Sequence, residues 1–390
     1  MQTHESETAD PYAAIRDAVR NLCTQYDSAY WQKVDEARGY PDKFVKAITE
    51  AGWLAALIPE EYGGSGLSVT EASIILEEVS RSGAFAGAVH GQMYVMGCVL
   101  RHASREQKKS YLPGIASGEL RMQSMAVTEP TAGTDTTKIK TVAVKKGDHY
   151  VVNGQKVFIS RVRHSDLLLL LARTTPIDKV KKKSEGLSVF IVDLRQAVGK
   201  GLTVKPIRNM ANQETNELFF DNLQVPAGNL IGEEGKGLRY ILDGLNAERI
   251  LISAECIGDG YWFIDKATAY AKDRVVFDRP IGQNQGIQFP IARAYASVQA
   301  ADLMRYKAAA LFDAGKPCGA EANMALYLGA NASWEAANAC LQTHGGYGFA
   351  AEYDIERKFR ETRLYQVAPI STNLILSYIG EHVLDLPRSF

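Results

Sequence analysis

The segment LNAERIL, residues 245–251, places a carboxylate inside a run of mostly apolar residues. In a helix, Glu248 would have Leu245 and Leu251 as neighbours at a spacing of three. A carboxylate on such a face is partly desolvated, which raises its pKa toward the range of a general base. Gly244, one helical turn earlier, leaves room for a ligand. Two interpretations follow from these residues alone: Glu248 takes a proton from a ligand, or it forms an ion pair within a helical bundle.

Four further stretches carry hydroxyls, glycines and charges of kinds that bind ligands. They are MAVTEPTAGTDTTKIKT (125–141), GQKVFIS (154–160), DRVVFDRPIGQNQGIQF (273–289) and QTHGGYGFAAEYDIERKFRE (342–361). None has the strand–GxGxxG–helix context of a Rossmann phosphate loop, and none has the spacing of metal ligands. Each stretch by itself is equally compatible with a turn or a helix cap. Their order and combination point to a ligand site.

Three regions of different periodicity must position these residues. Residues 1–122 show helical spacing of apolar residues, as in FVKAITEAGWLAALI, and Ser68 or Thr70 is a candidate helix cap. Residues 123–235 contain short β-branched or aromatic runs such as HYVVNGQKVFIS, DLLLLLART and LSVFIVDL, separated by Gly, Pro and Asn. Helical patterns return in residues 236–390. The order predicts an α+β multidomain fold: an N-terminal α-helical domain, a middle antiparallel β domain rather than βαβ units, and a C-terminal helical bundle.

The composition is that of an ordinary globular chain. Of 390 residues, 46% are hydrophobic and 23% are charged, and the formal net charge is -1. This balance gives no electrostatic reason to expect nucleic acid or an anionic membrane as a partner. No apolar run approaches the roughly 20 residues that span a bilayer. The acidic opening MQTHESETADPYAAIRDAVRNL resembles neither a secretory signal nor an Arg-rich transit peptide, so we expect a cytoplasmic protein without membrane insertion.

The cysteines are scattered and have no CxxC spacing. They are Cys23, Cys98, Cys256, Cys318 and Cys340. An odd, unpatterned set argues against a disulfide framework and against a zinc site, and it fits a reduced compartment. Two of them lie in apolar stretches, Cys98 and Cys256, and are expected to be small buried packing residues. The basic run KVKKKSEG, residues 179–186, is expected to be a solvated hairpin loop.

Segments along the whole chain resemble the acyl-CoA dehydrogenase family. The resemblance rests on GWLAALIPEEYGGSGLS, AVTEPTAGTD, FDRPIGQNQGIQFP and QTHGGYGFAAEYDIERKFRETRLYQ. It implies a C-terminal four-helix bundle, one FAD per subunit and a homotetramer built as a dimer of dimers. It also implies an acyl-CoA substrate, the introduction of an α,β double bond, and reoxidation by an electron-transfer flavoprotein.

The same resemblance assigns a set of cofactor-binding positions. Phe158, where the family more often has Trp, would lie against the flavin, and Ser160 would bind near its N5 atom. Arginine is a bidentate phosphate partner and glycine allows close backbone approach, which fits the positions that would grip the pyrophosphate. The full set is Val127, Thr128, Thr134, Phe158, Ser160, Arg274, Phe277, Gln285, Gln342, Gly345, Gly346, Ser371 and Asn373.

The family's base is often a Glu near the C-terminus, in a segment like YEGT. Here the matching stretch is LYQVAPISTN, and Pro369 occupies the Glu position. A second group of members, which includes isovaleryl- and long-chain acyl-CoA dehydrogenases, supplies the base from a bundle helix, and LNAERIL matches that segment. The resemblance and the vacancy at Pro369 together favour Glu248 as the catalytic base over the ion-pair interpretation.

Pro369 also removes a backbone N–H that the family uses to polarise the thioester carbonyl. Losing one such donor commonly costs about 3–4 kcal/mol of transition-state stabilisation. Two alternatives therefore remain from the sequence. One keeps the fold and flavin but changes the chemistry to a flavin oxidase, a monooxygenase or a non-redox lyase. The other is a non-enzymatic relative.

Several residues are candidates for contacts with the acyl-CoA. The resemblance assigns substrate binding to Thr134, Leu245, Arg249, His90 and Gln92. A histidine and a glutamine in AVHGQM would give the acyl cavity a polar wall and imply a short or substituted acyl chain, although a helix histidine with its own partner is equally compatible. The segment SRVRH, with Arg161, Arg163 and His164 after the flavin-facing serine, is interpreted as a solvated, charged strand end. The alternative is that one of the three reaches the substrate or an electron-transfer partner.

Overall fold

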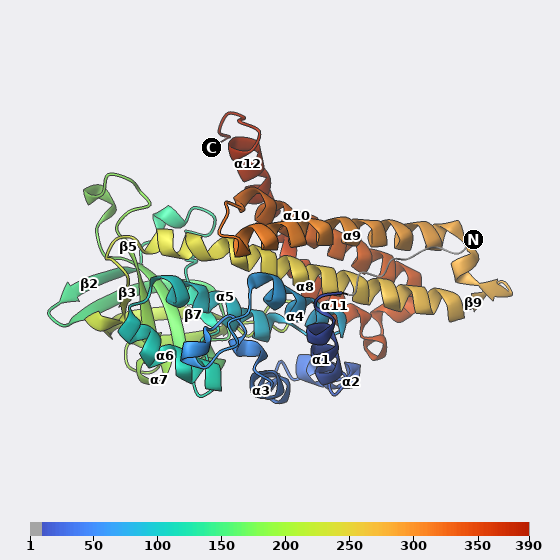
Figure 1. The fold of residues 1–390 in the computed structure, drawn as a ribbon, viewed down its shortest axis with the longest axis horizontal. Helices are drawn as coiled ribbons and strands as arrows, with labels where there is room; N and C mark the ends of the chain where they lie inside the picture. Colours follow the sequence, from blue (N-terminus) through green and yellow to red (C-terminus); the bar gives the residue numbers. More distant parts are fainter. Residues whose placement is uncertain (1–9, 390) are drawn as a thin grey trace.

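The computed structural model describes residues 10–389, and along the chain it has a helical region, a β-sheet domain and a second helical region (Figure 1). The sheet lies at one end of the molecule, and long helices of the C-terminal region extend from it to the other end. This order confirms the α+β fold class that the sequence predicts. The domain boundaries at residues 122 and 235 stay a prediction. The prediction that the acidic N-terminal segment is not a targeting signal involves residues 1–9, which lie outside the described part of the chain.

The N-terminal region is helical. Its helices are α1 (Ala13–Cys23), α2 (Ser28–Glu36), α3 (Asp42–Glu50), α4 (Val69–Arg81), α5 (Gly87–His102) and α6 (Arg105–Ser117). Ser68 caps α4 in a reciprocal capping box with Glu71, which confirms the predicted cap. The helical pattern expected to run on to Ile58 is wrong beyond Glu50. Gly52 adopts a left-handed φ of 82° there and ends the helix, and only a short 3-10 turn follows.

The middle region forms one mixed sheet. Its elements are β1 (Ser124–Ala126), β2 (Val142–Lys146), β3 (His149–Ser160), β4 (Leu167–Arg173), β5 (Leu187–Asp193), the short helix α7 (Leu194–Ala197), β6 (Leu202–Ile207), β7 (Thr215–Pro226) and β8 (Leu230–Ile231). The order is β6-β7-β3-β2-β4-β5-β8, with β1 beside β4. The expectation of a purely antiparallel domain is wrong at β4, which runs parallel to β1 and to the end of β2. The chain leaves β3 on one side of β2 and returns on the other, and such a crossover allows parallel pairing.

Strand β4 is buried along its whole length and joins two cores. Leu167, Leu169 and Leu171 pack into the apolar cluster that includes residues of α5 and α6. The alternate residues Leu168 and Leu170 pack into the separate cluster formed by the other strands. Because side chains alternate across a strand, one apolar run supplies both faces. The sheet is thereby fixed against the N-terminal helices, and the expected hairpin loop at residues 179–186 connects β4 to β5 at the surface.

The C-terminal region is dominated by three long helices that pack lengthwise (Figure 1). Its elements are α8 (Gly237–Asp273), β9 (Val275–Val276), β10 (Arg279–Pro280), α9 (Gln285–Asp313), α10 (Gly319–His344), α11 (Ile355–Thr362) and α12 (Thr372–His382). Helix α11 packs against α8 and α10 and completes the bundle, whereas α12 projects away from it. The N-terminal helix α4 also packs on α8. The segment after α8 was expected to be a plain helix–turn–helix, but it contains the small antiparallel hairpin β9–β10.

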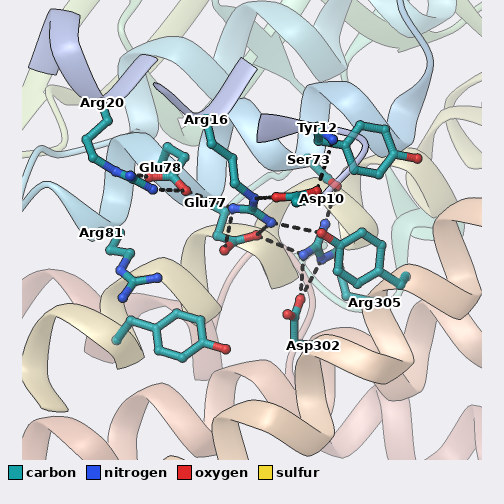
Figure 2. Close-up of polar contacts among 12 residues, drawn as sticks. Asp10, Tyr12, Arg16, Arg20, Ser73, Glu77, Glu78, Arg81, Asp302 and Arg305 are labelled. Atoms are coloured by element: carbon teal, nitrogen blue, oxygen red, sulfur yellow. Dashed lines mark hydrogen bonds and ion pairs between the residues drawn. The ribbon is translucent and has the colours of Figure 1, made fainter. Parts of the chain in front are cut away.

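A buried ionic cluster ties α1, α4 and α9 together (Figure 2). Glu77 of α4 accepts hydrogen bonds from Arg16 of α1 and from Arg305 of α9, each at 2.8 Å. Arg305 has no exposed surface and also contacts Asp302 and the Ser73 hydroxyl. Because ionised groups are stable in a core only when paired, these contacts hold the three helices in one relative position.

Two further findings bear on the class of protein. Within residues 10–389, no helix is both long enough and apolar enough to cross a membrane. The five cysteines are all buried and free. Cys98 and Cys256 are 4% and 0% exposed, which confirms the prediction that they are packing residues.

Replacing Arg305 with leucine should strongly destabilise the fold. The variant leaves the buried Glu77 and the partly buried Asp302 with less positive charge beside them, and breaking a buried pair typically costs about 3–5 kcal/mol. Chemical denaturation followed by circular dichroism measures the change in the free energy of unfolding.

The matched control is Arg20→Leu. Arg20 pairs with Glu78 of the same cluster, but its side chain is 51% exposed. Exposed pairs contribute under about 1 kcal/mol, so this variant should unfold almost as the wild type does. An equal decrease in the free energy of unfolding of the two variants would show that burial does not determine how strongly an arginine of the cluster stabilises the fold.

Candidate active site

Glu248 lies on α8 and is removed from water. Only 2% of its surface is exposed, and the neighbouring positions Ala247, Ile250 and Leu251 belong to the apolar core. Burial raises the pKa of Glu248 to about 7, while the positive charges of His90 and Arg249 oppose that rise. A carboxylic acid with this pKa is partly ionised at neutral pH. It is therefore suited to accept a proton and to return it.

A cluster of polar side chains from three elements lies around Glu255, close enough for its charges to act on Glu248. His90 of α5 places Nδ1 3.0 Å from Oε1 of Glu255, which lies two turns along α8 from Glu248. Tyr365 donates its hydroxyl to the other carboxylate oxygen of Glu255 at 3.1 Å. The Tyr94 ring lies 4.7 Å from the His90 ring, and burial together with the charge of Glu248 raises the pKa of Tyr94. Sequence reasoning missed Glu255, Tyr94 and Tyr365.

Helix α8 has open space at a position one turn before Glu248. A side chain at Gly244, one turn before Glu248, would meet no atom within 4 Å. Leu245 is half-buried beside this space. Arg249 donates to Asn246 at 2.9 Å, while its Nε atom has no hydrogen-bond partner in the described part of the chain. The base candidate and two of the predicted substrate contacts thus occupy one stretch of α8.

A second group of predicted residues gathers at the edge of the β domain. The backbone of Thr128 accepts a hydrogen bond from the Val157 N–H at 2.9 Å, which joins the loop after β1 to β3. The buried ammonium of Lys156 donates to the Val127 carbonyl at 2.9 Å and fixes the same loop from inside. Phe158 takes a left-handed φ of 60° and is 64% exposed, although it is a large apolar residue.

The conformation and exposure of Phe158 indicate a surface that a ligand covers. A non-glycine residue with positive φ is uncommon and often marks a functional position. Ser160 follows two residues later, at the end of β3, and Thr134 is exposed on the loop between β1 and β2. A flat, exposed aromatic ring flanked by hydroxyls is suited to bind a planar ring system that carries polar edges.

A cavity of about 700 Å³ lies at the opposite end of the long helices. Arg274, Gly345 and Gly346 are among its lining residues. At either glycine an added Cβ would meet no atom within 4 Å, so the backbone is open to close approach by a ligand. The cavity fits a phosphate-containing cofactor, because it joins exposed backbone to an arginine that has no acidic partner in the described part of the chain.

The remaining cofactor positions lie near this cavity or on α12. Phe277 is 94% exposed in the β9–β10 hairpin, and Gln285 is exposed at the start of α9. Gln342 is exposed just before the glycine pair. Ser371 caps α12, and Asn373 is exposed in its first turn. The β-domain group and the cavity group lie at different ends of α8 within one chain (Figure 1).

The interpretation of SRVRH as a solvated strand end is wrong for Arg161. Arg163 is exposed and pairs with Glu214 at 2.6 Å, as expected for a solvated residue. His164 is half-buried and its ring stacks on Tyr40 at 4.2 Å. Arg161, in contrast, is only 6% exposed. Its left-handed φ of 58° ends the extended strand, and its side chain packs inside the molecule.

His90 and Gln92 do not form one wall of a cavity. Residues two apart on an α-helix point about 200° away from each other. His90 faces Glu255, whereas Gln92 is 1% exposed and neither of its amide atoms has a partner within residues 10–389. The two residues face different neighbours, and their assignment to the substrate stays a prediction.

The fold and these two sites together define a cofactor-dependent enzyme that has a buried carboxylate as its candidate base. The chain matches three family profiles: the acyl-CoA dehydrogenase N-terminal domain over residues 10–119, its middle domain over 124–223 and its C-terminal domain over 235–384.

Comparisons with individual proteins identify the same family as these profiles. An acyl-CoA dehydrogenase of Bacillus subtilis is 36% identical and the alignment covers 95% of this chain and 97% of the relative. A glutaryl-CoA dehydrogenase of Desulfococcus multivorans is 34% identical, with 96% and 97% covered. The solved structure of an acyl-CoA dehydrogenase from Geobacillus kaustophilus superposes with a TM-score of 0.91 at 29% identity and covers 98% of this chain and 100% of that one.

The chain therefore belongs to the acyl-CoA dehydrogenase family, whose members are flavin-dependent oxidoreductases that act on the CH–CH bond of acyl-CoA. This confirms the predicted family and class of enzyme.

Valine in place of Gly346 should remove the flavin without unfolding the protein. The φ of Gly346 is not left-handed and open space surrounds its Cα, so the protein alone accommodates a side chain there. A bound cofactor would collide with that side chain. We expect normal circular dichroism together with a lower ratio of flavin to protein absorbance after purification.

Gly228→Val is the matched control, because this glycine is also exposed and unhindered but lies in the β domain. A Gly346→Val protein that keeps its full flavin content would exclude the cavity near Arg274 as part of the cofactor site.

Proposed function

We propose that the chain is an FAD-dependent acyl-CoA dehydrogenase in which Glu248 removes the α-proton of the acyl thioester. The observation that supports this most directly is a buried carboxylate with a pKa of about 7, one helical turn from the open position at Gly244. The electron pair of the broken α C–H bond becomes the α,β double bond, and the proton goes to a carboxylate oxygen of Glu248. When bound, the flavin supplies the acceptor at N5 for the hydride that leaves the β-carbon.

The residues around Glu248 adjust its proton affinity. Burial alone would keep the carboxyl protonated, whereas the charges of His90 and Arg249 favour its ionised form. The balance places the pKa near neutrality, where a base is both available and strong enough. Leu245 and Gly244 precede Glu248 by about one turn and border the space in which the reacting carbons would lie.

The missing N–H of Pro369 has a candidate replacement in the next residue. The backbone N–H of Ile370 donates to no acceptor within the described residues. The Ala368 N–H, in contrast, is already bonded to the Leu364 carbonyl at 3.0 Å. We infer that Ile370 is the donor that polarises the thioester carbonyl. This inference favours dehydrogenation over the oxidase, monooxygenase and lyase alternatives that Pro369 raised.

The cofactor contacts are part of the same proposal. The exposed ring of Phe158 and the hydroxyls of Thr128 and Ser160 would hold the isoalloxazine, with Val127 beside them. The positions around the large cavity would hold the pyrophosphate and adenosine: Arg274, Phe277, Gln285, Gln342, Gly345 and Gly346. Ser371 and Asn373 at the start of α12 would complete the set, and Thr134 would contact the CoA portion of the substrate.

Further parts of the proposal follow from the family resemblance. We infer a cytoplasmic homotetramer, built as a dimer of dimers, that passes its electrons to an electron-transfer flavoprotein. Exposed apolar residues on α9 support assembly, because Phe289 is 55% and Leu303 is 74% exposed. Large apolar side chains exposed along one helix are typical of surfaces that another chain covers.

Glu248→Gln should abolish reduction of the flavin by an acyl-CoA. An amide cannot accept the α-proton, and the loss of a general base typically costs about 10²–10⁴-fold in rate. In the wild type the rate should rise with pH through about 7, because Glu248 is protonated and inactive below that pH. Anaerobic stopped-flow absorbance of the flavin measures both effects.

The control is Asp243→Asn, which removes an exposed carboxylate about one turn away on the same helix and should leave the rate unchanged. Flavin bleaching that persists in Glu248→Gln would assign the base to another residue.

Leu303→Glu should reduce the size of the assembly, because a charge replaces an apolar side chain that we expect to be covered by a second copy. Analytical ultracentrifugation should give a tetramer for the wild type and smaller species for the variant. Val144→Glu, at an exposed apolar position on β2, is the control and should remain a tetramer. A wild-type monomer would exclude this part of the proposal.

A further inference from the structure

Arg161 is a buried cation next to the active-site cluster. It follows Ser160 directly, and its guanidinium packs against α5 where that helix has two glycines. A Cβ at Gly87 would lie 2.1 Å from Nη2, and a Cβ at Gly91 would lie 3.4 Å from Nη1. The absence of side chains at these two positions is therefore what makes room for the guanidinium.

The charge of Arg161 has no acidic partner at ion-pair distance within residues 10–389. Its side chain makes one hydrogen bond, from Nη2 to the amide oxygen of Gln213 at 2.9 Å. Other buried arginines differ in this respect: Arg305 contacts Glu77 and Asp302, and Arg357 contacts two acids as well. An unpaired charge in a protein core is strongly unfavourable, so an isolated buried guanidinium indicates a ligand anion.

The position of Arg161 relates it to the acyl group rather than to the CoA. Tyr94 lies close enough to Glu248 and to Arg161 for both charges to act on its hydroxyl, whose pKa is raised mainly by burial. Gly87, Gly91 and Tyr94 lie on one face of α5, at helical spacings of four and three. Because the two glycines adjoin Arg161 and Tyr94 is near Glu248, an acyl chain that ran along this face from Glu248 would reach the guanidinium.

The groups near Arg161 leave it available to a ligand. Glu255 is already contacted by His90 and by the Tyr365 hydroxyl. Glu214 is contacted by Arg163 at 2.6 Å. Within residues 10–389, Nη1 and Nε of Arg161 have no hydrogen-bond acceptor, and a guanidinium edge of this kind matches the two oxygens of a carboxylate.

We propose that Arg161 binds a carboxylate at the far end of the acyl chain, so that the enzyme acts on thioesters of dicarboxylic acids. This inference rests on the proposed function, because it assumes that the acyl chain lies beside Glu248. The distal carboxylate would form a charge-assisted, bidentate hydrogen bond and neutralise the guanidinium. An acyl chain that ends in a methyl group would leave the cation buried and unpaired, and would therefore bind more weakly.

The test compares acyl chains of equal length with and without the terminal carboxylate. The flavin-loaded enzyme is mixed anaerobically with glutaryl-CoA and valeryl-CoA, and with adipyl-CoA and hexanoyl-CoA. Flavin bleaching gives the rate, and calorimetry gives the dissociation constant whether or not bleaching occurs. We expect the wild type to bind the dicarboxylic thioesters roughly 10- to 100-fold more tightly, as a hydrogen bond between charged groups allows.

Arg161→Met should abolish or reverse that preference, and Arg161→Lys should keep part of it. Arg163→Met is the matched control, because it removes an exposed arginine two residues away and should keep the full preference. If Arg161→Met does not retain its flavin, Gly87→Ala provides a second route. The new methyl group would displace Nη2 and should weaken binding of the dicarboxylic thioesters selectively.

Two results would overturn the inference. One is equal affinity of the wild type for both members of each pair. The other is an equal loss for both members in Arg161→Met, which would assign Arg161 to the flavin or to the fold. Failure of the proposed function has a different signature, because no thioester would then bleach the flavin, or bleaching would survive in Glu248→Gln.

Discussion

The helices around Glu248 exclude water from its carboxylate, and the proposed chemistry depends on that exclusion. A carboxylate in water has a pKa too low for it to remove a proton from carbon at a useful rate. Desolvation raises the pKa to about 7, and His90 and Arg249 limit the rise. The side chain therefore sits near the point at which ionisation and basicity are both adequate. Any movement that admits water would lower the pKa and weaken the base.

The position of α8 is maintained by buried charges on its other faces. Glu77 of α4 is held by Arg305 of α9 and by Arg16 of α1, so helices that pack around α8 are themselves tied together. On α8 itself, the buried Asp259 contacts the ammonium of Lys358 on α11. These pairs join segments that lie far apart in the sequence. Because a buried charge without its partner is costly, they favour one arrangement of the bundle over alternatives.

The ligand sites lie where this packing is interrupted. Gly244 leaves a gap beside Glu248, and Gly345 and Gly346 leave backbone exposed in the cavity near Arg274. At Phe158 a left-handed residue turns a large ring to the surface. Each feature would weaken an isolated protein core. A bound cofactor or substrate would supply the missing contacts at each of these positions.

The sequence by itself determined the class of fold and the family. Runs of β-branched and aromatic residues marked β3 and β5 nearly to the residue, and the long helical patterns marked α8 and α10, because such composition and periodicity reflect local backbone geometry. The apolar neighbours of Glu248 also predicted its burial, since they lie on the same helix. The parallel pairing of β4 was not predictable in this way, because it depends on how the chain crosses the sheet.

Only the tertiary structure decided the burial and the contacts of side chains whose neighbours come from elsewhere in the chain. Arg161 stands in a charged segment and looks solvated in the sequence, yet Gly87 and Gly91 of a distant helix make a buried site for it. Glu255 and Tyr365 meet across 110 residues of sequence, and no local pattern marks either of them. Local periodicity records which face of an element is apolar. Which charges meet between elements is set by the packing of the whole chain.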